Sequence, residues 1–210
     1  MYIYLHGFAS SPNSAKARYI RDRFREIHTN LKIPDLNLGD FSHLTITRQL
    51  KQVAAEFPPD KTPVTLIGSS LGGMTAAHLA QQHPQVQRLV LLAPAFGFLS
   101  HWLPKLKEEE LQRWQREKYL MVYHYGEERS LPLSYDFVTD AAQYQEEKLQ
   151  RPIPTLILHG KQDEVIPIQA SRDFALQRPW VELVELQSDH SLGNVMTEIW
   201  LSIQLFCQLP

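Results

Sequence analysis

The chain contains a single cysteine in 210 residues. Cys207 therefore has no partner for an intramolecular disulfide, and its place in a C-terminal helical pattern predicts a packing role rather than a reactive thiol. An excess of one charge is also missing, because 21 basic and 23 acidic side chains give a formal net charge of −2 without a long single-sign block. This balance argues against nucleic acid as a partner.

Long hydrophobic runs are absent as well, so no segment is expected to span a membrane. Residues 1–5 form a strand-like run that lacks the basic segment and cleavage site of a secretory signal, and we therefore expect a cytoplasmic protein. With 43% hydrophobic residues, the chain can bury a sizeable core without disulfides or metals. A single domain over residues 1–210 is the resulting expectation.

Strand-like runs alternate with helical patterns along the chain. The predicted strands are residues 2–5, 31–36, 64–67, 89–92, 155–159 and 181–186. The predicted helices are residues 14–28, 46–57, 74–82 and 195–206. This alternation predicts an α/β fold with a mostly parallel central sheet flanked by helices. Residues 97–151 interrupt the rhythm without a convincing strand, and we interpret them as a helical cap inserted over the candidate site.

The most informative motif is G-S-S-L-G at residues 68–72, between a predicted strand and a predicted helix. That is the setting of a nucleophile elbow, in which the middle serine adopts a strained backbone and the glycines let strand and helix pack closely. Ser70 is therefore the candidate nucleophile. Ser69 is the alternative if the glycine frame is misread.

Polar residues follow two later strands of the predicted sheet. Asp163 lies just beyond residues 155–159, and His190 lies beyond residues 181–186. The carboxyl ends of parallel strands meet at one edge, and the chain order Ser70, Asp163, His190 is that of an α/β-hydrolase triad. In such a triad His190 would take the serine proton, and Asp163 would orient the histidine ring and stabilise its charged form.

Other carboxylates and histidines compete for these roles. Glu164 adjoins Asp163, but the segment from His159-Gly160 to the apolar residues 165–167 favours Asp163. Asp189 adjoins the candidate histidine, and neighbouring residues rarely point their side chains at each other. His6 and His159 both precede a glycine at a strand end, where we expect structural hydrogen bonds.

Metal and cofactor chemistry is not favoured by the spacing of the polar residues. Several histidines are expected near one sheet edge, but no H-x-x-x-H or C-x-x-C spacing accompanies them. Residues 68–73 lack the lysine of a phosphate loop, and no acidic residue lies about 20 positions further on to hold a ribose. We expect neither a metal nor a cofactor.

Over nearly its whole length the chain resembles α/β-hydrolase serine hydrolases. Residues 4–17 and 68–73, Y-L-H-G-F with S-S-P and S-A-K-A followed by G-S-S-L-G-G, are similar to the small bacterial YqiA-like esterase family. Residues 159–167 resemble the broader serine-hydrolase pattern. The resemblance implies a serine esterase that forms an acyl-enzyme, with the backbone N–H of Phe8 as one oxyanion-hole donor. The residue after the nucleophile, Leu71, would supply the other.

The aromatic residues gathered in the cap have two interpretations. Phe96 and Trp102, with His6, are candidates for lining an acyl pocket, but a cap also needs aromatic residues simply to pack onto the main domain. No lone charge stands out as an anchor, so we expect a small to medium, uncharged acyl group on a small-molecule ester. A thioesterase or serine peptidase with the same triad, a lyase, and a non-catalytic binding protein of the same fold remain as alternatives.

Overall fold

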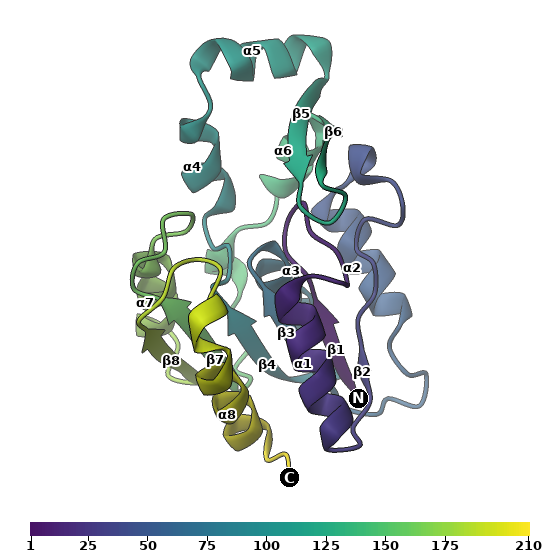
Figure 1. The fold of residues 1–210 in the computed structure, drawn as a ribbon, viewed down its shortest axis with the longest axis vertical. Coiled ribbons are helices and arrows are strands. Elements are labelled where there is room, and N and C mark those ends of the chain that lie inside the picture. Colours follow the sequence, from purple (N-terminus) through teal and green to yellow (C-terminus); the bar gives the residue numbers. More distant parts are fainter.

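The computed structural model describes residues 1–210 and contains one six-stranded sheet with helices on both faces (Figure 1). The strand order is β2-β1-β3-β4-β7-β8, and every neighbouring pair is parallel. The strands are β1 (Tyr2–Leu5), β2 (Leu31–Lys32), β3 (Val64–Ser69), β4 (Val86–Leu92), β7 (Thr155–Gly160) and β8 (Val181–Leu186). The predicted parallel α/β sheet is therefore confirmed, and all carboxyl ends lie at one edge.

Helices cover the two faces of the sheet and divide its core into two clusters. On one face lie α1 (Ala15–Glu26) and α8 (Met196–Cys207); on the other lie α2 (Ile46–Ala55), α3 (Leu71–Gln82) and α7 (Ile168–Leu176). Successive side chains of a strand point to opposite faces of the sheet and so contribute to both clusters. In β1, Ile3 and Leu5 belong to one cluster and Tyr4 to the other. None of these helices combines the length and apolar character needed to cross a membrane.

Local capping explains where two of the predicted helices begin. Ser14 caps α1 by accepting a hydrogen bond from the Ala17 N–H, and Thr45 caps α2 by accepting one from the Arg48 N–H. Predicted helices at residues 14–28 and 46–57 are thus confirmed, with ends shifted by one to two residues. At the other end of the chain, Cys207 is buried in α8, and burial raises the pKa of its thiol to about 11. That environment fits the predicted packing role.

The second strand is shorter than its apolar pattern predicts. Residues 31–36 read as one strand, yet β2 pairs with β1 only through Leu31 and Lys32. Pro34 lacks an N–H for the ladder, which is why proline is confined to strand edges and ends. Beyond it the Leu36 N–H donates to His6 Nε2 at 3.0 Å, so a side chain replaces the sheet as its partner.

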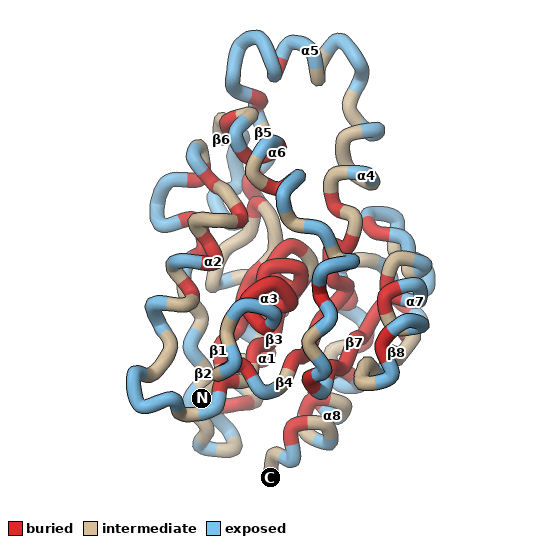
Figure 2. Tube along the Cα trace, turned by 180° about the vertical axis from the view of Figure 1, so that it is seen from behind, coloured by how far each residue is buried: buried red, intermediate tan, exposed pale blue.

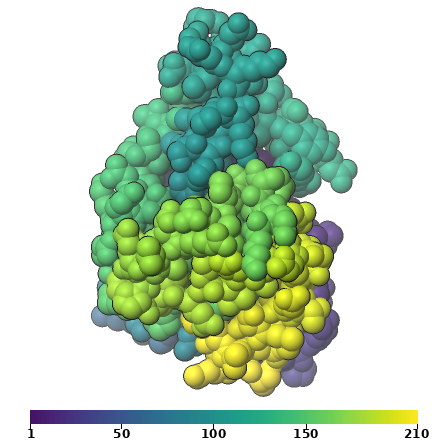
Figure 3. All heavy atoms as spheres, turned by 90° about the vertical axis from the view of Figure 1, so that its left-hand side faces the viewer, coloured from purple at the N-terminus to yellow at the C-terminus, as the bar shows by residue number.

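Residues 98–141 of the predicted insertion rise above the sheet (Figures 1 and 3), whereas Arg151, at the end of the insertion, donates to the Ala80 and His83 carbonyl oxygens at the C-terminal end of helix α3. The raised part forms a cap. Its main elements are α4 (Phe98–Trp102), α5 (Glu108–Glu117), β5 (Tyr119–His124), β6 (Arg129–Ser134) and α6 (Asp136–Ala141). Helix α5 lies at the far tip and is mostly exposed, whereas α3 is buried at the centre of the molecule (Figure 2). The cap is therefore helical only in part.

The antiparallel hairpin β5–β6 corrects the sequence interpretation, which predicts no strand in the cap. Alternation in β5 is hidden because its outward positions are apolar too: Tyr119, Met121 and Tyr123 are exposed while Leu120 is buried. In β6 the ladder includes Pro132, a residue that normally argues against a strand. A two-stranded sheet has only edge strands, which tolerate such a residue.

A buried histidine on α3 makes stability depend on pH. The His78 Nε2 atom has no hydrogen-bond partner, its ring packs edge-on against Tyr144, and burial lowers its pKa from 6.5 to about 4. Below pH 6.5 the unfolded chain binds a proton here that the folded chain does not. The free energy of unfolding should therefore fall as pH drops from 6.5 towards 4, by up to about 1.4 kcal/mol per pH unit.

The variant His78→Leu should show a flatter pH dependence of stability in that window. Urea unfolding of both proteins at several pH values between roughly 7 and 4.5 measures it. At pH 8 the two should differ only by a constant offset, since the imidazole is neutral in both folded and unfolded chains there. Equal slopes in parent and variant would contradict the assignment.

Candidate active site

The predicted nucleophile lies on a strained turn between β3 and α3. Ser70 has φ 53° and ψ −121°, a backbone conformation that residues other than glycine rarely adopt. Helix α3 approaches the end of β1 so closely that a Cβ on Gly72 would stand 2.5 Å from the His6 carbonyl oxygen and closer still to that of Leu5. The glycine frame of the motif is thus required by packing, as predicted for a nucleophile elbow.

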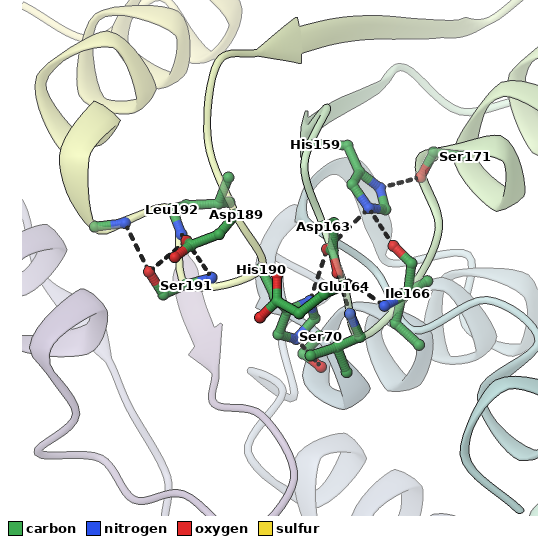
Figure 4. Close-up of polar contacts among 12 residues, drawn as sticks. Ser70, His159, Asp163, Glu164, Ile166, Ser171, Asp189, His190, Ser191 and Leu192 are labelled. Carbon is green, nitrogen blue, oxygen red and sulfur yellow. Dashed lines mark hydrogen bonds and ion pairs between the residues drawn. The ribbon is translucent and has the colours of Figure 1, made fainter. Parts of the chain in front are cut away.

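The three predicted triad residues come together at the carboxyl edge of the sheet (Figure 4). His190 Nε2 lies 3.1 Å from Ser70 Oγ, and His190 Nδ1 lies 2.7 Å from Asp163 Oδ2. The His190 side chain is 17% exposed and that of Asp163 is fully buried. Ser70 follows β3, Asp163 follows β7 and His190 follows β8, so parallel strands supply each residue from the same edge.

The competing residues have other partners. Asp189 Oδ1 accepts hydrogen bonds from the Ser191 N–H, the Ser191 hydroxyl and the Leu192 N–H, and so closes the turn after His190. Glu164 is exposed and offers its backbone carbonyl to Lys105. Ser69 is buried as the last residue of β3. None of the three contacts the His190 ring.

Asp163 is held as a carboxylate by its surroundings. Burial raises the pKa of this carboxyl, but hydrogen bonds from His159, His190 and the Ile166 backbone outweigh burial and hold the pKa well below its usual range. Its Oδ1 accepts from the N–H groups of Val165 at 2.9 Å and Ile166 at 2.8 Å. The negative charge next to His190 Nδ1 can therefore stabilise a protonated ring.

The loop after β1 lies directly against the candidate nucleophile. A Cβ added to Gly7 would stand 3.3 Å from Ser70 Cβ, so the backbone of residues 6–8 runs beside that serine. Leu71, the first residue of α3, belongs to the helical turn whose N–H groups have no partner within the helix. Phe8 directly follows Gly7, which lies against Ser70, and Leu71 directly follows Ser70 itself. These are the positions expected for the two backbone donors of an oxyanion hole.

Two of the predicted pocket residues are placed in the core. His6 is 1% exposed; its Nε2 accepts from Leu36 and its Nδ1 lies 3.0 Å from the Gly7 carbonyl oxygen. Phe96 is buried and stacks on Phe174 with ring centroids 4.2 Å apart. Phe96 also lines a cavity of about 210 Å³ with His101 and Phe174, but Ser70, Asp163 and His190 do not line that cavity. The pocket role expected for His6 and Phe96 beside Ser70 therefore stays a prediction.

Three aromatic side chains of the cap, together with Phe41 of the main domain, pack around Phe8. The Phe8 ring lies 5.2 Å from Trp102, 5.4 Å from Phe137, 5.5 Å from Phe98 and 5.7 Å from Phe41, measured between ring centroids. The packing interpretation of the cap aromatics therefore accounts for these residues, including Trp102. Sequence reasoning missed that the Phe8 ring connects the loop after β1 to the cap.

Two further polar residues lie near the candidate triad: Lys16, which sequence reasoning missed, and His159, which was expected to make structural hydrogen bonds but without Asp163 as a named partner. Lys16 of α1 places its Nζ 3.5 Å from the His190 carbonyl oxygen, and burial lowers the pKa of its amine to about 8 against the opposing charges of Asp163 and Asp189. His159 hydrogen-bonds Asp163 from the end of β7. The S-A-K-A segment and the histidine before Gly160 were the available sequence signals.

The structure has no metal-ligating cluster, and the cavity at the base of the cap does not include Ser70, Asp163 or His190. No group of three or more His, Cys, Asp or Glu side chains is arranged to hold a metal ion. A cavity of about 480 Å³ at the base of the cap is lined by Met74, Phe98, Tyr144 and Glu146, among others, and not by the three triad residues.

A parallel sheet with a strained serine after β3, an aspartate after β7 and a histidine after β8 defines an α/β-hydrolase fold. The chain belongs to the uncharacterised protein family UPF0227, whose model matches residues 1–207. A curated relative, the mitochondrial palmitoyl-protein thioesterase ABHD10 of mouse, is 25% identical over 207 residues, which cover 90% of this chain and 68% of the relative.

Two solved structures show the same fold at low sequence identity. Mouse alpha/beta hydrolase domain-containing protein 10 superposes with a TM-score of 0.80 at 23% identity, covering 99% of this chain and 89% of that one. Est1E of Butyrivibrio proteoclasticus with bound ferulic acid gives a TM-score of 0.82 at 21% identity, with 99% and 87% covered. Both likenesses concern the fold.

Proposed function

We propose that this protein is a serine hydrolase that cleaves a carboxylic ester through an acyl-enzyme, with Ser70, His190 and Asp163 as its triad. The observation that carries the proposal is the continuous hydrogen-bonded chain from Ser70 Oγ through both nitrogens of His190 to Asp163 Oδ2, with distances of 3.1 and 2.7 Å. Each contact is within the range required for proton transfer and ring orientation.

The proposed proton path follows the hydrogen-bonded chain from Ser70 to Asp163. Asp163 accepts the Nδ1–H of His190, which leaves Nε2 unprotonated and able to accept from the Ser70 hydroxyl. Ser70 Oγ attacks the ester carbonyl carbon while its proton passes to Nε2, and the protonated ring then gives that proton to the departing alcohol oxygen. In the second half a water molecule loses a proton to Nε2 and attacks the acyl carbon. The bond from that carbon to Ser70 Oγ then breaks, Nε2 returns the proton to Oγ, and the acid leaves.

The negative oxygen of each tetrahedral intermediate requires two donors. In the proposal these are two backbone N–H groups, that of Leu71 in the elbow and that of Phe8 in the loop beside it. Because both donors are backbone groups, they stay in place when a side chain changes. They are also preorganised, since the elbow and the neighbouring loop are fixed by close backbone packing.

Covalent labelling with a fluorophosphonate tests the proposal, because capture of this probe requires an activated serine. The expected result is one adduct per chain, located at Ser70 by intact mass followed by peptide mapping. The Ser70→Ala variant, which removes only the hydroxyl, is the control and should not be labelled. Absence of an adduct on well-folded parent protein would instead favour a binding protein of the same fold.

The acyl group is proposed to be small to medium and uncharged. Support comes from the cap, whose aromatic rings pack on Phe8 and on one another and present no buried charge to pair with an anionic acyl chain. A series of p-nitrophenyl esters of increasing chain length should therefore show kcat/KM falling for long chains and for chains that end in a carboxylate. Best turnover on either of these would contradict the proposed preference.

A thioester is the second candidate substrate, favoured by the likeness to a palmitoyl-protein thioesterase. The same triad can cleave it, since only the leaving group changes from an alcohol to a thiol. Matched oxygen and sulfur esters of one acyl chain separate the two candidates. The ester proposal predicts comparable or higher kcat/KM for the oxygen ester, and a large preference for the thioester would favour the second candidate.

A further inference from the structure

A second histidine contacts the acid of the triad. His159 lies near the carboxyl end of strand β7 and is fully buried, and its Nε2 lies 3.1 Å from Asp163 Oδ2 (Figure 4). The same oxygen receives His190 Nδ1 at 2.7 Å. The Asp163 carboxylate is thus held between two imidazole rings, of which only His190 reaches Ser70.

The protonation of the His159 ring follows from its other partners. Nε2 also lies 3.0 Å from the Ile166 carbonyl oxygen, which can only accept, so Nε2 carries a hydrogen that it shares between this oxygen and Asp163. In a neutral ring Nδ1 is then an acceptor, and the hydroxyl of Ser171 at 2.7 Å is its donor. Ser171 is buried on α7, which fixes the ring from the side opposite the site.

All acceptor positions around the carboxylate are accounted for by these donors. Oδ1 takes the two backbone N–H groups of the following turn, and Oδ2 takes His190 and His159. Removal of His159 would leave Oδ2 with one donor in a site closed to solvent, where an unpaired charge is costly. More of the negative charge would then act on His190, and the carboxylate would be held by one imidazole ring instead of two.

We propose that His159, held by Ser171, is a positioning residue that keeps the Asp163 carboxylate aligned with His190 and limits how strongly that carboxylate attracts the His190 proton. The role rests on the proposed hydrolase function, because it acts through the triad. The hydrogen bonds of His159 go to Ser171, Asp163 and Ile166 and not to Ser70. Its effect must therefore appear in the alignment and protonation of His190.

The other charged groups around His190 and Asp163 are few and fixed. Lys16 approaches from α1, Asp189 closes its own turn, and Glu164 with Lys105 of the cap lies on the exposed side of the acid loop. All four stay unchanged in variants of His159. A displacement of the pH profile in such variants thus reports the contact with Asp163.

Two substitutions at one position separate positioning from packing. His159→Leu removes the donor and keeps an apolar side chain, whereas His159→Gln keeps an N–H₂ group able to reach both Asp163 and Ile166. For His159→Leu we expect kcat lower by roughly ten-fold or more, as for the loss of about one charge-assisted hydrogen bond, with KM little changed. We also expect the acid limb of the kcat/KM profile to move to higher pH. His159→Gln should restore both towards the parent.

A measurement that needs no turnover runs beside the kinetics. The low-field proton resonance of the His190–Asp163 hydrogen bond should shift or broaden in His159→Leu and return in His159→Gln. A folded His159→Leu protein with the parent's acid limb and resonance would overturn the proposal. If this variant does not fold, Ser171→Ala decides, because a parent-like limb and resonance there would overturn it equally. A parent without esterase activity, but with a resonance that responds to these variants, would fault the proposed function and not the positioning role.

Discussion

Replacement of His190 by alanine is expected to lower kcat on an activated ester by roughly 10⁴-fold or more while the protein keeps its fold. The ring is partly exposed, and its hydrogen bonds go to Ser70 and Asp163. Its removal therefore eliminates the proposed base and costs little packing energy. Initial rates with p-nitrophenyl acetate, together with circular dichroism and a thermal melt, measure both effects. His43→Ala is a suitable control, since this exposed histidine bonds to Asp40 and Tyr119 and to none of the three candidate triad residues.

The double variant sharpens this expectation. Residues that act as one unit are non-additive, so Ser70→Ala combined with His190→Ala should be no slower than either single variant. Independent, multiplying losses would contradict a shared mechanism. Activity of His190→Ala within ten-fold of the parent would mean that another base serves Ser70.

The second large effect is expected in stability and concerns Gly72. In Gly72→Ala the new methyl group would overlap the carbonyl oxygens of Leu5 and His6, which are backbone atoms at the end of a central strand and cannot rotate away. We expect the free energy of unfolding to fall by about 3 kcal/mol, at the upper end for overpacking in a core. Urea unfolding with a common m-value measures the difference.

Gly193→Ala is the matched control for this substitution. A Cβ there would meet only the Ser191 hydroxyl, at an ordinary contact distance of 3.5 Å. Its stability should stay within about 0.5 kcal/mol of the parent. Similar losses in both variants would show that alanine is disfavoured for general reasons and that the approach of α3 to β1 is not the cause.

The parts of the fold that the sequence predicts are those governed by local patterns. Periodic apolar residues predicted the six strands of the large sheet and four of the helices, but not α7. The glycine frame around Ser70 predicted the elbow. Both signals reflect short-range requirements of backbone packing. The order of Ser70, Asp163 and His190 predicted their meeting, since parallel strands end at one edge. Their separations required the structure.

The misses share a different cause, which is long-range packing. The sequence does not predict the hairpin β5–β6, because exposed Met121 and Tyr123 conceal its alternation. Nor does it predict the stacking of Phe96, a candidate pocket residue, on Phe174. His159 was expected to make structural hydrogen bonds, and it does. That its partner is Asp163 depends on how the loop after β7 folds back, which no local pattern encodes.

The position of the Phe8 ring has a consequence for how a substrate could enter. Phe8 carries a proposed oxyanion donor on its backbone, and its ring is enclosed by Phe98, Trp102 and Phe137 of the cap. A cap that swung away as a rigid flap would strip these neighbours from the ring and release the loop beside Ser70. Such an open form could admit substrate but would be inactive, and the oxyanion donor of Phe8 would return to its position only when the cap closed again. Entry and turnover would then alternate, which protects an exposed serine from reacting indiscriminately.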